Sequence, residues 1–211
     1  MNRDSASPIP ASARLAGAAP VMAVALGVTA GLWFAVYALV PPLAGMDAPL
    51  ARLVFALKCS GVAILLTFMT GIEAIAHERL GSAAFDPLAG HETRRLRINA
   101  RYAQNTAEQV LIFVPGLLML ALYSDGGAGM RAVVAATLVW TLSRFVFWIG
   151  YHRGAAQRMP GLVGYGQSLI ILLYVCARFG YEVAGPVGAS VPVLLFAAIE
   201  AIILLALRRT A

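Results

Sequence analysis

Six apolar stretches, each close to 20 residues long, constrain this chain more than any other feature of its sequence. They cover residues 20–40, 50–76, 102–123, 132–151, 162–181 and 191–207. A helix of about 20 mostly apolar residues is long enough to cross the hydrocarbon core of a bilayer. The sequence therefore predicts an all-α integral membrane protein with six transmembrane helices.

Composition supports the same class. Sixty per cent of the 211 residues are hydrophobic and 12% are charged, whereas an average soluble domain is about a quarter charged. A water-exposed globule of this composition would be insoluble, which excludes a cytosolic enzyme, a free nucleic-acid-binding protein and a disordered tail. We interpret the formal charge of +6 as the basic bias of cytoplasmic loops and expect no nucleic-acid partner.

The placement of arginines predicts the orientation of the chain. With both termini cytoplasmic, the inside segments hold eleven arginines and the outside segments hold two, Arg52 and Arg131. Cytoplasmic loops are enriched in Lys and Arg. The alternation requires all six crossings, so the bias also supports the number of helices.

The third stretch begins with polar residues. Arg101, Asn105 and Glu108 are spaced i, i+4 and i+7, so they share one face of a helix. Glu108 lies roughly 10 Å along the axis from Arg101. A carboxylate and an amide at that depth are costly unless they face protein or a water-filled cavity.

The fourth stretch carries Arg144 inside an apolar run and Tyr151 seven residues later on the same face. The short connection at 124–130 predicts that the third and fourth helices are antiparallel neighbours. Residues at equal distance from that turn then lie at equal depth. Glu108 is therefore expected level with Arg144, and Arg101 level with Tyr151.

These residues predict a polar pocket that opens to the cytoplasmic face. Arg153 and Arg158 add positive charge at its mouth, so the pocket should attract an anionic cytoplasmic molecule. The alternative is a structural ion pair between Glu108 and Arg144 that only holds the two helices together. The basic run at 94–97 is interpreted as part of a loop facing solvent or lipid headgroups.

The combined pattern is Arg101-x-x-x-Asn105-x-x-Glu108, then Arg144 and Tyr151, then Arg158 before Pro160-Gly161. It resembles the MAPEG family, the membrane-associated proteins in eicosanoid and glutathione metabolism, and its bacterial members especially. The resemblance covers residues 50–181. It implies a four-helix bundle assembled as a homotrimer in the bacterial inner membrane, with glutathione bound between adjacent subunits at the cytoplasmic side.

The resemblance also divides the chain. Residues 50–183 are expected to form the four-helix core. Residues 1–18 would be a cytoplasmic tail, 19–49 an extra transmembrane helix with its loop, and 184–211 an extra C-terminal transmembrane helix with a short tail. The two extra helices would flank the core.

Roles for individual residues follow from the resemblance alone. Arg101, Asn105 and Glu108 would bind the charged ends of glutathione. Arg144 and Tyr151 would complete the pocket, and Arg79 would be a further glutathione-binding arginine. Arg158 would activate the thiol, with Tyr151 as the other catalytic residue. Phe147 departs from the pattern, because several members carry a polar Tyr or His there.

The expected function is a glutathione-dependent transferase or peroxidase whose thiolate attacks a lipophilic small molecule from the bilayer. A non-catalytic scaffold or lipid-binding protein of the same fold is the first alternative, favoured by Phe147 and the extra helices. A small transporter is the second, with Glu108, Lys58 and Glu200 as a charge path. Lys58 and Glu200 both lie inside predicted spans, where pairing between the second and sixth helices is one account of them. No metal site is expected.

Overall fold

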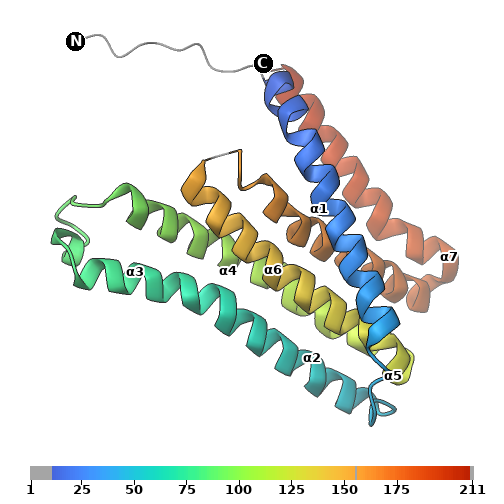
Figure 1. The fold of residues 1–211 in the computed structure, drawn as a ribbon. Helices are drawn as coiled ribbons and strands as arrows, with labels where there is room; N and C mark the ends of the chain where they lie inside the picture. Colours follow the sequence, from blue (N-terminus) through green and yellow to red (C-terminus); the bar gives the residue numbers. More distant parts are fainter. Residues whose placement is uncertain (1–10, 155, 210–211) are drawn as a thin grey trace.

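The computed structural model describes residues 11–154 and 156–209, which are mostly helical and contain no β-strand. This confirms the predicted all-α class. The elements are α1 Ala11–Leu39, α2 Pro49–Ile64, the π-helical turn η1 Leu65–Met69, α3 Thr70–Leu80, η2 Ala83–Phe85, α4 Arg94–Leu122, α5 Gly126–Gly129, α6 Arg131–Arg153, η3 Met159–Leu162 and α7 Val163–Arg209. Figure 1 shows them arranged as long rods.

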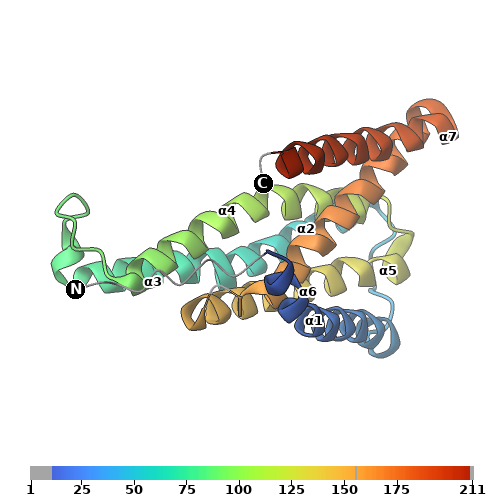
Figure 2. The same cartoon turned by 90° about the horizontal axis from the view of Figure 1, so that it is seen from above.

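Five helical stretches among the described residues are long and apolar enough to cross a membrane. The last of them, Met159–Arg208, has 50 residues. It is interrupted at Ala184 and Gly185, whose backbone angles are not helical, and there the chain turns back on itself (Figures 1 and 2). The two halves of α7 therefore correspond to the fifth and sixth predicted helices.

The turn in α7 is shorter than the sequence predicts. The sequence places a connection over residues 182–189 between the fifth and sixth apolar stretches. Gly185 has a φ of 62°, a conformation that glycine adopts readily. Pro186 follows, and proline is well suited to the first turn of a helix because it has no N–H to satisfy. Two residues are therefore enough to reverse the chain.

The core lies where α4 and α6 pack against α2 and the first half of α7. Phe113 and Trp140 stack there with their ring centroids 4.4 Å apart. Met130 and Val175 are fully buried beside them. Near the other end of α6, Asn99 accepts a hydrogen bond of 2.9 Å from the indole of Trp148. These contacts hold α4 and α6 side by side as antiparallel neighbours.

The α1 helix packs mainly against α6 and η3. It begins at Ala11, so residues 11–18 of the predicted tail are helical, while residues 1–10 lie outside the described residues. The apolar part of α1 runs from Ala19 to Leu39. The first turn of α1 and the last turn of α7 lie at the same end of the molecule (Figure 1).

The start of α4 corrects one interpretation of the sequence. The basic run at 94–97 belongs to the first turns of α4 and not to a loop. Thr93 caps this helix, since its hydroxyl accepts a hydrogen bond of 3.0 Å from the backbone N–H of Leu96. Arg95 also forms an ion pair of 3.1 Å with Glu78 of α3. Capping and pairing thus extend the helix before the apolar stretch begins.

Candidate functional site

A polar hollow of about 200 Å³ lies between α4 and α6, toward the end where α4 begins and α6 ends. We call it the polar hollow. Its lining residues are Arg101, Gln104, Asn105, Glu108, Phe147, Tyr151 and Arg158. Five of these seven were singled out in the sequence as site residues. The structure therefore brings together side chains that stand up to 57 positions apart along the chain.

One wall of the hollow is a ladder of side chains along α4. The guanidinium of Arg101 donates to Gln104 Oε1 at 3.1 Å, and the amide of Gln104 donates to Glu108 Oε1 at 3.3 Å. The spacings of three and four residues place these groups on one helix face. All three side chains are exposed in the single chain, so this wall of the hollow is open.

Arg144 forms the base of the site, behind the lining. Its side chain is fully buried. Nη2 donates to Asn105 Oδ1 at 3.1 Å and to Thr106 Oγ1 at 2.9 Å. The guanidinium carbon also lies 4.5 Å from the ring centroid of Phe147 and 5.3 Å from that of Tyr102, which are favourable cation–π distances.

The remaining donors of Arg144 are unsatisfied. Nε and Nη1 are buried and have no hydrogen-bond partner among the described residues. Buried polar groups without a partner are costly and call for an explanation. Asn105 and Phe147 contact this guanidinium and also line the hollow. A buried positive charge therefore stands directly behind the wall of the cavity.

Glu108 and Arg144 do not form the ion pair considered as an alternative, since neither belongs to an ion pair among the described residues. The reason is angular. Equal depth does not give equal direction around a helix axis: Asn105 and Thr106 face α6, whereas Glu108 points to the open side of α4. Arg144 is consequently held by an amide and a hydroxyl.

Arg158 reaches the hollow from beyond the end of α6. Its guanidinium carbon lies 4.7 Å from the ring centroid of Tyr151 and 5.7 Å from that of Phe147. The chain after α6 can fold back this closely because Gly150 has no side chain. A Cβ at Gly150 would lie 2.8 Å from the Cα of Arg158. The glycine therefore positions the arginine.

Gly161 makes a similar contact further along the same segment. A Cβ at Gly161 would lie 2.6 Å from the Cα of Phe147. The η3 turn is thus packed directly against the backbone of α6. This contact fixes the segment that carries Arg158 at one end.

The site combines three guanidinium groups with one carboxylate. Arg101 and Arg158 line the hollow, Arg144 lies behind it, and Glu108 is the acidic group. Arg79 is elsewhere: it lies in the last turn of α3, and its Nη2 is 3.9 Å from a carboxylate oxygen of Glu92. Within one chain, the structure does not bring Arg79 to the hollow.

Two contributors were not recognised in the sequence. Thr106 binds Arg144, and Gln104 links Arg101 to Glu108. Gln104 could have been found from its spacing, because it lies three residues after Arg101 and four before Glu108. Thr106 carries no such signal, since a threonine in an apolar helix commonly donates to the backbone carbonyl four residues earlier, as this one does to Tyr102 at 2.7 Å.

Comparisons with known proteins match the part of the chain that forms this site. The model of the MAPEG family matches residues 53–181, which include every residue of the polar hollow. An uncharacterized protein of Synechocystis sp. is 37% identical over 73 residues, which are 35% of this chain and 50% of that protein. The chain thus matches half the length of this relative. No solved structure matches.

Proposed function

The chain belongs to the MAPEG family, and from that membership we propose that it is a glutathione-dependent transferase or peroxidase acting on a lipophilic electrophile. The convergence of Arg101, Asn105, Glu108, Tyr151 and Arg158 on one hollow carries this proposal. Family membership supports the glutathione-related class. The geometry of the hollow supports the assignment of residues.

The charges of the polar hollow fit the ionic groups of glutathione. The tripeptide carries two carboxylates, one ammonium and a thiol. Arginines bind carboxylates through paired hydrogen bonds, which assigns Arg101 in the lining to a carboxylate. Arg144 contributes from behind the lining, where its buried charge favours an anionic group and orients Asn105. Glu108 is the acidic group available to the ammonium. Asn105 supplies an amide between them.

The hollow is incomplete in one chain. Its volume of about 200 Å³ is below the range of roughly 300–1,000 Å³ that is typical of small-molecule sites. Its α4 wall is also exposed. We infer that a second copy of the chain closes it, as in a homotrimer. Arg79 would then reach glutathione from a neighbouring subunit.

Arg158 is assigned to the thiol. A guanidinium close to a thiol stabilises the thiolate, lowers the thiol's pKa and so increases the nucleophilic fraction. Tyr151 lies against Arg158 and holds the guanidinium in the hollow, where its hydroxyl is a further donor for sulfur. The thiol proton is released to water as the thiolate forms.

The electrophile arrives from the bilayer. In conjugation, the thiolate sulfur forms a bond to an electrophilic carbon, and the leaving group departs with its electron pair. In peroxide reduction, the thiolate sulfur attacks a peroxide oxygen, the O–O bond breaks, and the alkoxide takes a proton from water and leaves as the alcohol. The resulting glutathione sulfenic acid reacts with a second glutathione thiol, which yields the disulfide and water. A hollow at the end of two membrane helices holds the thiolate and the electrophile in one place, which raises their effective concentration.

Titration of purified protein with glutathione tests the proposal. Wild type should bind saturably at millimolar glutathione and develop the ultraviolet absorbance of a thiolate. Arg144→Ala and Glu108→Ala should each weaken binding about tenfold or more, the effect of losing a charged hydrogen bond. Arg158→Ala should retain binding and lose the thiolate signal.

Arg178→Ala is the matched control. Arg178 lies in α7 against the ring of Tyr123, at the other end of the core, so its loss should leave the titration unchanged. Equal behaviour of wild type, Arg144→Ala and Glu108→Ala would show that the proposed site is wrong. This titration does not test the orientation of the chain, in which we propose that the hollow and both termini lie on the cytoplasmic side.

A further inference from the structure

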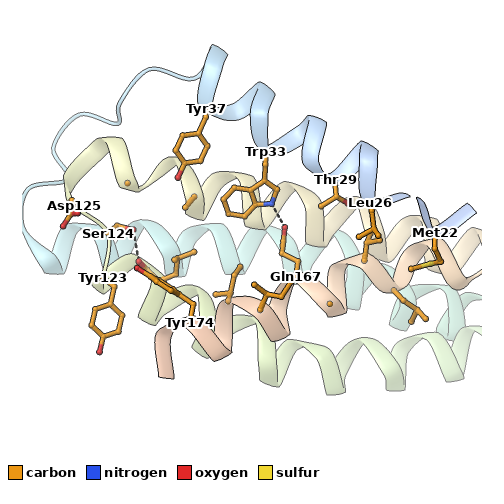
Figure 3. A pocket seen from close by; sticks show the side chains of 18 residues that line it. Met22, Leu26, Thr29, Trp33, Tyr37, Tyr123, Ser124, Asp125, Gln167 and Tyr174 are labelled. Atoms are coloured by element: carbon orange, nitrogen blue, oxygen red, sulfur yellow. Dashed lines mark hydrogen bonds between the residues drawn. The ribbon is translucent and has the colours of Figure 1, made fainter. Parts of the chain in front are cut away.

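A second cavity lies between α1 and the core and is mostly apolar (Figure 3). We call it the apolar groove. Its volume of about 730 Å³ falls within the range of small-molecule sites. Its walls come from α1, from the end of α4 and from α6 and α7. The α1 wall precedes residue 53, where the family match begins, so this cavity is a feature added to the family core.

The groove follows α1 for most of a membrane thickness. Met22 and Tyr37 both line it, and 15 residues of helix span about 22 Å. The hydrocarbon core of a bilayer is about 30 Å thick. Figure 3 shows Met22 at one end and Tyr37 toward the other, with Leu26 and Trp33 between them. A shape of this length suits one extended acyl chain.

The middle of the groove contains a polar pair that is already satisfied. The indole N–H of Trp33 donates to Gln167 Oε1 at 2.8 Å, and the amide of Gln167 donates to the carbonyl of Ala136 at 2.9 Å. Both ends of the Gln167 amide are therefore bonded to protein. An apolar chain can lie across the pair without leaving a polar group unpaired.

One end of the groove has an acidic side chain in its lining and a basic side chain packed behind one of its lining residues. Asp125 lines this end with an exposed carboxylate, which forms no ion pair among the described residues. Tyr37 also lines the groove toward this end, and Arg131 packs against it from outside the lining: its guanidinium carbon lies 4.9 Å from the ring centroid of Tyr37, and Nη1 donates to the Tyr37 carbonyl at 2.9 Å. This end of the groove lies where α4 ends and α6 begins, opposite the polar hollow.

From this arrangement we propose that the apolar groove binds one membrane phospholipid whose headgroup carries a primary amine. The acyl chain lies along α1, the ammonium meets Asp125, and the phosphate meets Arg131. A zwitterionic headgroup matches the two charges, whereas an anionic headgroup without an amine leaves Asp125 facing a phosphate. The lipid fills the space between α1 and the core. The site is independent of glutathione binding.

Lipid retention from defined vesicles tests the proposal. Protein reconstituted in equal parts of phosphatidylethanolamine and phosphatidylglycerol is solubilised, and its phospholipid is counted by native mass spectrometry. Wild type should retain one phospholipid per chain, with ethanolamine favoured about tenfold over glycerol headgroups, as expected for a charged hydrogen bond. Gly166→Leu should abolish retention, because Gly166 lines the groove and a Cβ there meets no atom within 4 Å.

Gly31→Leu is the matched control. Gly31 is equally open and lies on α1, but it does not line the groove, so retention should persist. Asp125→Asn, at an exposed position, should keep one lipid and lose the headgroup preference. Three results would overturn the proposal: no phospholipid on wild type, equal loss in both leucine variants, or no ethanolamine preference.

A glutathione titration of the same samples separates this proposal from the proposed function. Gly166→Leu should bind glutathione as wild type does. Retention of a lipophile without phosphate in place of phospholipid would contradict the headgroup assignment. Failure of glutathione binding with normal lipid retention would count only against the proposed function.

Discussion

The polar hollow and the apolar groove share α4 and α6, but they are built by opposite means, and the groove takes further walls from α1 and α7. The hollow has about 200 Å³ and three charged side chains in its lining, whereas the groove has about 730 Å³ and one, Asp125. The hollow lies inside the part of the chain that matches the family, and one wall of the groove lies outside it. The comparison indicates that one bundle holds a charged site within the family core and an apolar site that also depends on a helix outside it.

The two cavities also differ in what determines their ligands. Charged side chains in the hollow favour an ionic molecule through hydrogen bonds of defined direction. The groove selects by shape and apolar area along its length, and by charge only at one end. Variants that affect one cavity alone would sharpen this contrast, and variants that affect both would break it.

The largest effect confined to one cavity is expected for Arg101→Gln. Loss of a charged hydrogen bond to a glutathione carboxylate should weaken binding by about 1.5–3 kcal/mol. The side chain is exposed, so folding should change little. Isothermal titration measures the affinity, and lipid retention should remain at the wild-type level. A parallel loss of lipid would mean that the cavities are coupled.

Gly161→Ala tests the packing on which both cavities rest, because Gly161 lies between Phe147 of the hollow and Leu162 of the groove. A Cβ there would lie 2.6 Å from the Cα of Phe147, so η3 must move away from α6. Forcing an extra carbon into a packed contact destabilises by about 1–3 kcal/mol. Thermal unfolding in detergent measures this loss. Gly166→Ala is the control, because its Cβ meets no atom within 4 Å; an equal loss there would contradict the packing argument.

Trp33→Phe should loosen α1 with a smaller cost. The variant keeps an aromatic ring and removes the hydrogen bond to Gln167 Oε1. Loss of one such bond costs about 0.5–1.5 kcal/mol. The temperature of thermal unfolding and the amount of retained lipid should both decrease, and glutathione affinity should stay constant. If only the glutathione affinity changed, the assignment of Trp33 to the apolar groove would be wrong.

Added salt should produce the smallest difference. The α4 wall of the polar hollow is open to solvent in the single chain, and mobile ions screen exposed charges. Glutathione affinity should fall by less than about 1 kcal/mol, or roughly fivefold, as salt is raised from low to physiological levels. The amount of lipid retained in the same buffers should not change, because most of the groove is apolar.

Sequence reasoning located the hollow because charges are rare in membrane helices. Arg144 and Glu108 stand out within apolar runs, and their order along two antiparallel helices indicated their depth. Direction around the axis was not determined by that argument. The structure therefore replaced the Glu108 partner of Arg144 with Asn105 and Thr106.

The groove was not predictable in the same way. Its lining residues, such as Leu26 and Ile171, are apolar side chains in apolar helices and resemble their neighbours. Whether such residues pack against one another or leave a space depends on how α1 is tilted against the core, and no local pattern encodes that tilt. The transmembrane stretches themselves were predictable, since length and hydropathy alone define them.

The reversal at Ala184 and Gly185 bears on the proposal that both termini lie on the same side of the membrane. As one rod, Met159–Arg208 would be a single candidate span beside four others, an odd number. Two separate spans in α7 would make the number even. Reporter domains fused at either end would then be found in the same compartment.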